Sequence, residues 1–91
     1  MPSQTVTLHN PTGLHARPAK VFAQAAAKTG LDVTVTKDGN EVNAKSVLSV
    51  LTLDCHHGDE IMISVVGDGA EAALAELVSL VESGLGETIP S

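Results

Sequence analysis

Residues 31–44 read LDVTVTKDGNEVNA, and this stretch decides the fold that the sequence predicts. Over residues 31–37 apolar side chains alternate with polar ones, which is the pattern of a strand with one buried face. Asp38-Gly39 is a hairpin signal, because both residue types tolerate the backbone of a tight turn. Residues 41–44 then form a short return strand. The chain is therefore expected to contain an antiparallel strand pair.

Strand and helix patterns continue on both sides of this hairpin. The expected strands lie at residues 4–8, 31–37, 41–44 and 61–65, and the expected helices at residues 16–28, 46–53 and 70–83. Gly30 and Gly84 follow the two long helices and are natural helix stops. Residues 85–91 are expected to form a tail.

The outer faces of the predicted strands carry threonine, which indicates a sheet with one face in solvent. Antiparallel sheets tolerate such a face, whereas parallel sheets rarely do. A chain of 91 residues can hold one core, so we predict a single domain over residues 1–91. The predicted fold class is α+β: an open-faced β-sandwich with a four-stranded, mainly antiparallel sheet and three helices on one face. Its core must be aliphatic, because the chain has one Phe and no Trp or Tyr.

Charge and composition exclude several classes of partner. The formal net charge is -6, and no aromatic platform is available for stacking bases, so we expect no nucleic-acid partner. No apolar run approaches the ~18 residues that cross a bilayer, and residues 1–4 carry no secretory signal. The lone Cys55 excludes an internal disulfide. We therefore expect a cytoplasmic protein without membrane insertion.

Residues 12–19 read TGLHARPA and place His15 where a turn becomes a helix. The free backbone N–H groups at a helix start attract anions, and here they belong to Ala16 and Arg17. A neutral imidazole can accept a phosphoryl group, and the Arg17 guanidinium can bind its oxygens. Pro18 fits only the first helical turn, which it helps to fix. Because all eleven acidic residues lie within residues 32–91, the surround of His15 is expected to be locally positive and free of acids.

Residues 13–19, GLHARPA, resemble the active-site signature of the HPr family, the histidine-containing phosphocarriers of the bacterial sugar phosphotransferase system. Residues 43–48, NAKSVL, resemble the regulatory-serine region of the same family. The resemblance implies a phosphoryl carrier rather than a turnover enzyme, without a cofactor. Enzyme I loads the residue that matches His15, at Nδ1 in this family, and enzyme IIA domains unload it. In some lineages an HPr kinase/phosphorylase modifies the residue that matches Ser46, and the product binds a transcriptional regulator.

The region after Ser46 is expected to serve both structure and docking. Serine at a helix N-cap contributes ~1 kcal/mol without any modification, so its regulatory use stays open. A short helix cannot bury all of its apolar side chains, so some of them should form a docking patch. The candidate docking residues are Lys20, Val47, Leu48 and Leu51. A carrier with transient interfaces is expected to be a monomer.

Three alternatives concern use rather than fold. The tetrapeptide Asp54-Cys55-His56-His57 invites a metal site, but adjacent loop residues rarely converge on one ion, so none is expected. A second hypothesis, beside the phosphoryl carrier, is a regulatory binding module that acts through Ser46. Relatives of the Crh type, which only regulate, lack the histidine that matches His15, so the presence of His15 argues against that type. A nitrogen-related paralogue is the third, and it differs only in its partners.

Overall fold

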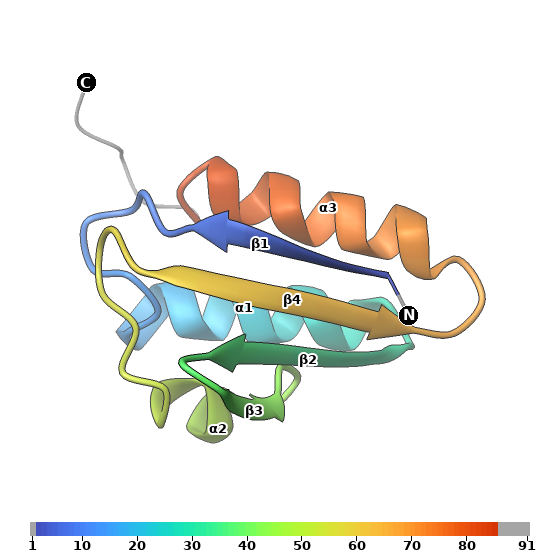
Figure 1. Ribbon diagram of the computed structural model, residues 1–91, viewed down its shortest axis with the longest axis horizontal. Helices are drawn as coiled ribbons and strands as arrows, with labels where there is room; N and C mark the ends of the chain where they lie inside the picture. Colours follow the sequence, from blue (N-terminus) through green and yellow to red (C-terminus); the bar gives the residue numbers. More distant parts are fainter. Residues whose placement is uncertain (1, 86–91) are drawn as a thin grey trace.

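The structure is a computed structural model that describes residues 2–85, and its architecture is the predicted open-faced sandwich (Figure 1). The elements are β1 (Ser3–Thr7), α1 (Ala16–Lys28), β2 (Asp32–Lys37), β3 (Asn40–Asn43), α2 (Val47–Leu51), β4 (Glu60–Val66) and α3 (Ala70–Glu82). The order β-α-β-β-α-β-α is therefore confirmed. Within the described residues, no helix is long and apolar enough to cross a membrane.

The sheet is antiparallel throughout, with the strand order β1-β4-β2-β3. The predicted hairpin joins β2 to β3, and its turn residues Asp38 and Gly39 both have positive φ, at 51° and 83°. Val33 and Val35 of β2 are fully buried beside β4, where Val35 pairs with Ile63. The alternation of apolar residues thus identified the face that packs against the helices.

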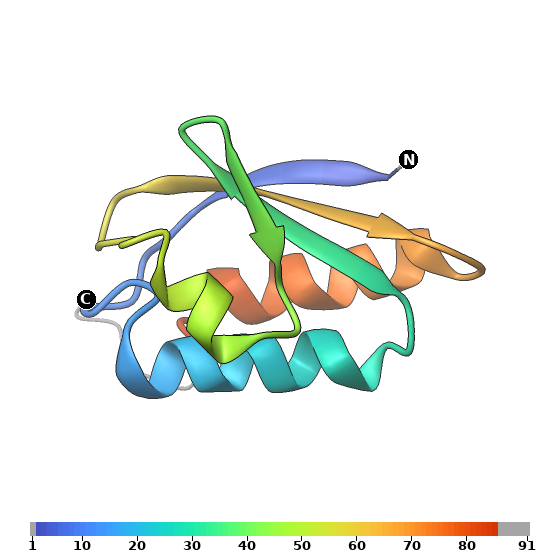
Figure 2. The same ribbon diagram turned by 90° about the horizontal axis from the view of Figure 1, so that it is seen from below.

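The helices cover one face of the sheet and leave the other open (Figure 2). The apolar stripe of α1 is buried: Ala19, Phe22, Ala23 and Ala26 are at most 1% exposed. In α3 the residues Leu74, Leu77, Val78 and Val81 are likewise buried. The short α2 packs beside α1, close to the end of the molecule where α1 begins (Figure 2). This arrangement places α2 and the start of α1 on a common surface.

The end of α3 corrects one expectation. Gly84 stops the helix as predicted, with φ at 97°, but Leu85 is only 1% exposed and belongs to the core. The N–H of Leu85 donates to the carbonyl of Leu80, and the N–H of Gly84 donates to that of Val81. This pattern is a Schellman motif, which folds the residue after the glycine back onto the helix. Leu85 therefore does not belong to the expected tail, and the other residues of that prediction, 86–91, lie outside the described part of the chain.

Candidate functional site

His15 occupies the N-cap of α1, as the sequence predicts. Its backbone is extended, with φ at -123° and ψ at 156°, and its side chain makes no capping hydrogen bond. The imidazole is therefore not used to close the helix, although a capping side chain normally satisfies one of the first N–H groups. The side chain is 34% exposed, so a partner can reach it.

The first turn of α1 is arranged to receive an anion. The helix begins at Ala16, so the N–H groups of Ala16 and Arg17 have no acceptor within the helix. No acidic residue lies in this turn to neutralise the positive end of the dipole. Pro18 is buried in the same turn, where its missing N–H costs nothing. The Arg17 side chain is exposed and forms no salt bridge within residues 2–85, so its guanidinium is free for a ligand.

Two loops that lie far apart in the sequence meet beside His15. The N–H of Leu14 donates to the carbonyl of Cys55 at 3.1 Å, and the N–H of Gly58 donates to that of Leu8 at 2.8 Å. Gly13 permits the closest approach, because a Cβ there would lie 2.6 Å from Cα of His56. The turn that carries His15 is thereby joined to the loop between α2 and β4, which contains Asp54 and His56.

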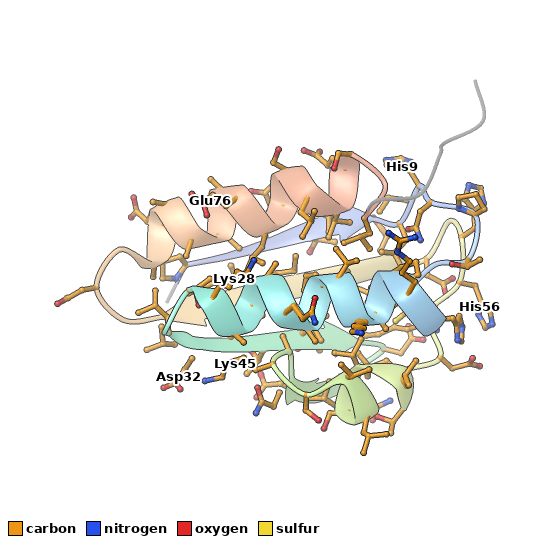
Figure 3. All side chains as sticks on the ribbon, turned by 180° about the vertical axis from the view of Figure 1, so that it is seen from behind. His9, Lys28, Asp32, Lys45, His56 and Glu76 are labelled. Carbon is orange, nitrogen blue, oxygen red and sulfur yellow. The ribbon has the colours of Figure 1, made fainter. Side chains whose placement is uncertain are left out.

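This junction brings an acidic residue to His15 and corrects the expectation of an acid-free surround. Oδ1 of Asp54 lies 3.4 Å from Nε2 of His15 and 3.4 Å from Nε2 of His56. The His15 and His56 rings are 5.0 Å apart between centroids, and His56 lies at the end of the molecule where α1 begins (Figure 3). Neighbours along the chain do not reveal this contact, because Asp54 belongs to a loop 39 positions away in the sequence.

Nε2 of His15 is shielded from solvent but forms no hydrogen bond within the described residues. Its separation from Asp54 is that of an ion pair rather than of an aligned hydrogen bond. The 34% exposure of this side chain therefore belongs to its other atoms. Asp54 itself has a left-handed backbone, with φ at 52°, which aspartate adopts more readily than most residues.

Lys37, which the sequence analysis left unassigned, braces the loop that carries Asp54 and His56. Its Nζ lies 3.1 Å from Oδ2 of Asp59 and donates to the carbonyl of Asp54 at 2.9 Å. Asp59 also accepts the backbone N–H of His56 at 2.8 Å, and these two hydrogen bonds hold the pKa of its carboxyl below the usual 3.8. No local sequence pattern predicts these contacts, because Lys37 ends β2 and is distant along the chain from Asp54 and Asp59.

The four residues of the loop tetrapeptide separate into different environments. Cys55 is fully buried, and burial raises the pKa of its thiol to about 11. Asp54 and His56, on either side of it, project from the surface towards His15. His57 is exposed and takes no part in the contacts around His15. Asp54 and His56 thus converge beside His15, although adjacent loop residues were not expected to converge, and Cys55 and His57 are not part of this group.

The candidate regulatory and docking residues lie at the start of α2, within α2 and on α1, the helix against which α2 packs. Oγ of Ser46 accepts the N–H of Ser49 at 3.3 Å, which confirms the predicted N-cap. The helix ends at Leu51, two residues earlier than expected, because Thr52 and Leu53 form a turn. Leu48 is 79% exposed, Val47 and Leu51 are half-buried, and Lys20 is exposed. The α2 surface thus exposes apolar side chains, and Leu48 contributes most of the exposed apolar area.

Comparisons with known proteins identify the family of this chain. The family model described as the PTS HPr component phosphorylation site matches residues 2–83. The chain belongs to the HPr family. A phosphocarrier protein HPr of Streptomyces coelicolor is 53% identical over 76 residues, which cover 82% of each protein. The HPr-like protein Crh of Bacillus subtilis is 38% identical over 82 residues, covering 90% of this chain and 96% of Crh.

Solved structures of HPr proteins share the whole fold. The crystal structure of HPr-C-His from Thermoanaerobacter tengcongensis superposes with a TM-score of 0.93 and 42% sequence identity, covering 98% of this chain and 100% of that one. The antiparallel sheet and three helices are therefore the HPr architecture. The family is one of phosphocarriers in the phosphotransferase system.

Proposed function

We propose that this chain is a stoichiometric phosphoryl carrier of the sugar phosphotransferase system. His15 accepts a phosphoryl group from phospho-enzyme I and donates it to enzyme IIA domains. The observation that carries the proposal is the start of α1, where the partly exposed imidazole of His15 makes no capping hydrogen bond and adjoins the first N–H groups of the helix and the exposed Arg17 side chain. The proposal requires no cofactor and places the protein in the cytoplasm as a monomer.

The geometry divides the transfer among a few groups. An imidazole nitrogen of His15, Nδ1 by resemblance to the family, attacks phosphorus as the bond between phosphorus and the donor breaks. The N–H groups of Ala16 and Arg17 then face the charge on the phosphoryl oxygens, as does the helix dipole. The Arg17 guanidinium can bind two of these oxygens. Because this transfer needs positioning and charge stabilisation, a rigid first turn fixed by Pro18 suffices.

The nearby Asp54 carboxylate favours the tautomer that this reaction needs. A neutral imidazole carries one proton, and a carboxylate 3.4 Å from Nε2 stabilises the proton on that nitrogen. The lone pair then lies on Nδ1, which becomes the nucleophile. Asp54 is in this proposal a positioning residue, because it acts on His15 and does not reach the phosphoryl group.

Incubation with phosphoenolpyruvate and enzyme I tests the carrier function. We expect one acid-labile phosphate per chain by mass spectrometry, lost in His15→Ala. His57→Ala is the matched control, because His57 is an exposed histidine outside the site, and this variant should be phosphorylated normally. An absence of phosphate, or phosphate that survives His15→Ala, would overturn the proposal.

The position of Ser46 supports a second, regulatory function. Ser46 caps α2 beside the exposed Leu48, so a phosphate there adds charge to the surface that the partners of His15 are proposed to contact. A dianion is tolerated at a helix start, and inhibition would follow from repulsion at the docking surface rather than from unfolding. The agents are an HPr kinase/phosphorylase and, downstream, a transcriptional regulator.

Mass spectrometry of the protein from its own cells tests this regulatory function. The proposal predicts acid-stable phosphate on Ser46 under some growth conditions. If no acid-stable phosphate appears under any condition, the regulatory function is rejected, while the carrier function of His15 stands independently.

A further inference from the structure

We infer that His15, Asp54 and His56 form a binding site for one Zn²⁺ ion. One donor atom from each of these three residues lies within 4.8 Å of the other two. Neither Asp54 nor His56 lies there for an evident packing reason, since their side chains are 71% and 62% exposed. Two imidazoles and a carboxylate form a ligand set that suits zinc, with a fourth position left for water.

The distances match the geometry of a tetrahedral ion. With metal–ligand bonds of about 2.1 Å, two ligands of such an ion lie about 3.4 Å apart. Oδ1 of Asp54 lies 3.4 Å from Nε2 of both His15 and His56. The two imidazoles thus approach one carboxylate oxygen at the spacing of ligands. His56 is exposed enough to rotate towards His15 and close the remaining side of the triangle.

The unsatisfied nitrogen of His15 is the second observation. Nε2 is shielded from solvent and forms no hydrogen bond in the described part of the chain, although it points towards Asp54. A buried polar atom without a partner is unfavourable, and a metal ion is one partner that satisfies it. Lys37 and Asp59 hold the loop that supplies the other two ligands. Binding an ion therefore costs less conformational entropy, because this loop is already ordered.

Zinc at this site changes the state of the nucleophile. Only a nitrogen with a lone pair can bind the ion, so a neutral His15 bound through Nε2 must carry its single proton on Nδ1. The Nδ1 lone pair that attacks phosphorus in the proposed function is then absent. Bound zinc should therefore inhibit phosphoryl acceptance; this consequence, unlike the binding site itself, rests on the proposed function.

Titration of the untagged protein with Zn²⁺ tests the site directly. We expect saturable binding of one ion per chain by calorimetry, and NMR shifts confined to the rings of His15 and His56. His56→Ala should weaken binding about tenfold or more, because it removes one of three ligands. The matched control His57→Ala removes an exposed histidine of the same loop and should bind as the parent does. Absence of saturable binding, or equal losses in the two variants, would overturn the site.

Phosphorylation assays with and without Zn²⁺ test the consequence. His56→Ala serves here too, because it leaves the phosphoryl-transfer groups intact while lacking a metal ligand. Zinc should slow phosphorylation of the parent and of His57→Ala, but not that of His56→Ala. Equal inhibition of all three chains would mean that zinc acts on enzyme I, and the inhibitory consequence would be wrong. If the zinc-free parent is not phosphorylated, the proposed function fails, while the calorimetric result still decides the binding site.

Discussion

The proton on His15 determines whether its ring can act as a nucleophile, and Asp54 is the residue placed to control that proton. The carboxylate faces Nε2, and the exposed part of the His15 side chain consists of its other atoms. The same pair of atoms accounts for both proposals, because either a proton or a metal ion can lie between them. In these two proposals a single carboxylate connects the activity of His15 to its inhibition.

Asp54→Asn is predicted to slow phosphorylation of His15 without changing the fold. The substitution removes a charge from a pair whose carboxylate is 71% exposed, so solvent screens most of the interaction. An exposed pair of this kind contributes at most about 1 kcal/mol, which corresponds to a rate reduced about twofold to fivefold. Stopped-flow phosphorylation measures the rate, and nitrogen-15 shifts of the His15 ring should show a smaller fraction of proton on Nε2. An unchanged tautomer would contradict the positioning role.

Cys55 is predicted to resist alkylation in the folded protein. Burial raises the pKa of its thiol from 9.0 to about 11, so the thiolate fraction at mildly alkaline pH falls about a hundredfold. Iodoacetamide should therefore modify Cys55 at least about a hundredfold more slowly in the native state than in denaturant. Reactivity should rise with pH through the range near 11 for as long as the fold persists. Rapid native-state alkylation below that range would contradict the burial of this side chain.

Among the helices, α2 has five residues and depends on its cap and its packing rather than on its length. Val50 is fully buried, whereas Leu48 on the other side is 79% exposed. The helix therefore has one face that anchors it and another that is available to a partner. Ser46 is relevant to both faces, because it caps the start of the helix and precedes the exposed residues around Leu48.

Ser46→Ala is predicted to destabilise the protein, and Ser46→Asp to preserve its stability. Alanine cannot accept the N–H of Ser49, and loss of an N-cap costs about 1 kcal/mol. Aspartate is an equally good N-cap and places a favourable charge at the helix start. Thermal unfolding should show a lower Tm for the alanine variant only. If phosphoryl acceptance falls in Ser46→Asp at an unchanged Tm, the effect lies in docking and not in folding.

The elements that sequence reasoning predicted are those set by local rules. The period of the apolar residues in α1, the turn at Asp38-Gly39 and the cap at Ser46 each depend on neighbours along the chain. The burial of Leu85 was missed, because the helical period ends with α3. The backbone motif that follows the helix buries one further residue, which the period does not predict. The approach of Asp54 to His15 was missed for a stronger reason: it depends on two loops that only the complete sheet brings together.

At the scale of the whole molecule, one end of the sandwich holds the site together. The turn before α1 and the loop before β4 lie side by side there (Figure 1), joined by backbone hydrogen bonds from Leu14 and Gly58. Gly13 stands at the closest point of this junction. The site of His15 thus depends on the packing of two loops, and not only on the first turn of its own helix.

Gly13→Ala is predicted to be among the most destabilising single methyl additions in this chain. The backbone φ of 64° disfavours alanine by about 1 kcal/mol, and the new Cβ overlaps the backbone of Cys55 and His56. Backbone cannot rotate aside as a side chain can, so the overlap should add about 1–3 kcal/mol. At about 4–8 °C per kcal/mol for a domain of this size, Tm should fall by more than about 8 °C.

Gly39→Ala separates the two contributions to this loss. Its φ of 83° is equally unfavourable for alanine, but nothing lies within 4 Å of the added Cβ. The free energy of unfolding of this variant should therefore fall by only about 1 kcal/mol, the cost of placing alanine at a positive φ. Calorimetric unfolding of both variants gives the difference, which measures how tightly the two loops are joined beside His15. Equal losses in Gly13→Ala and Gly39→Ala would show that the loops can separate at little cost, and Asp54 would then not be held against His15.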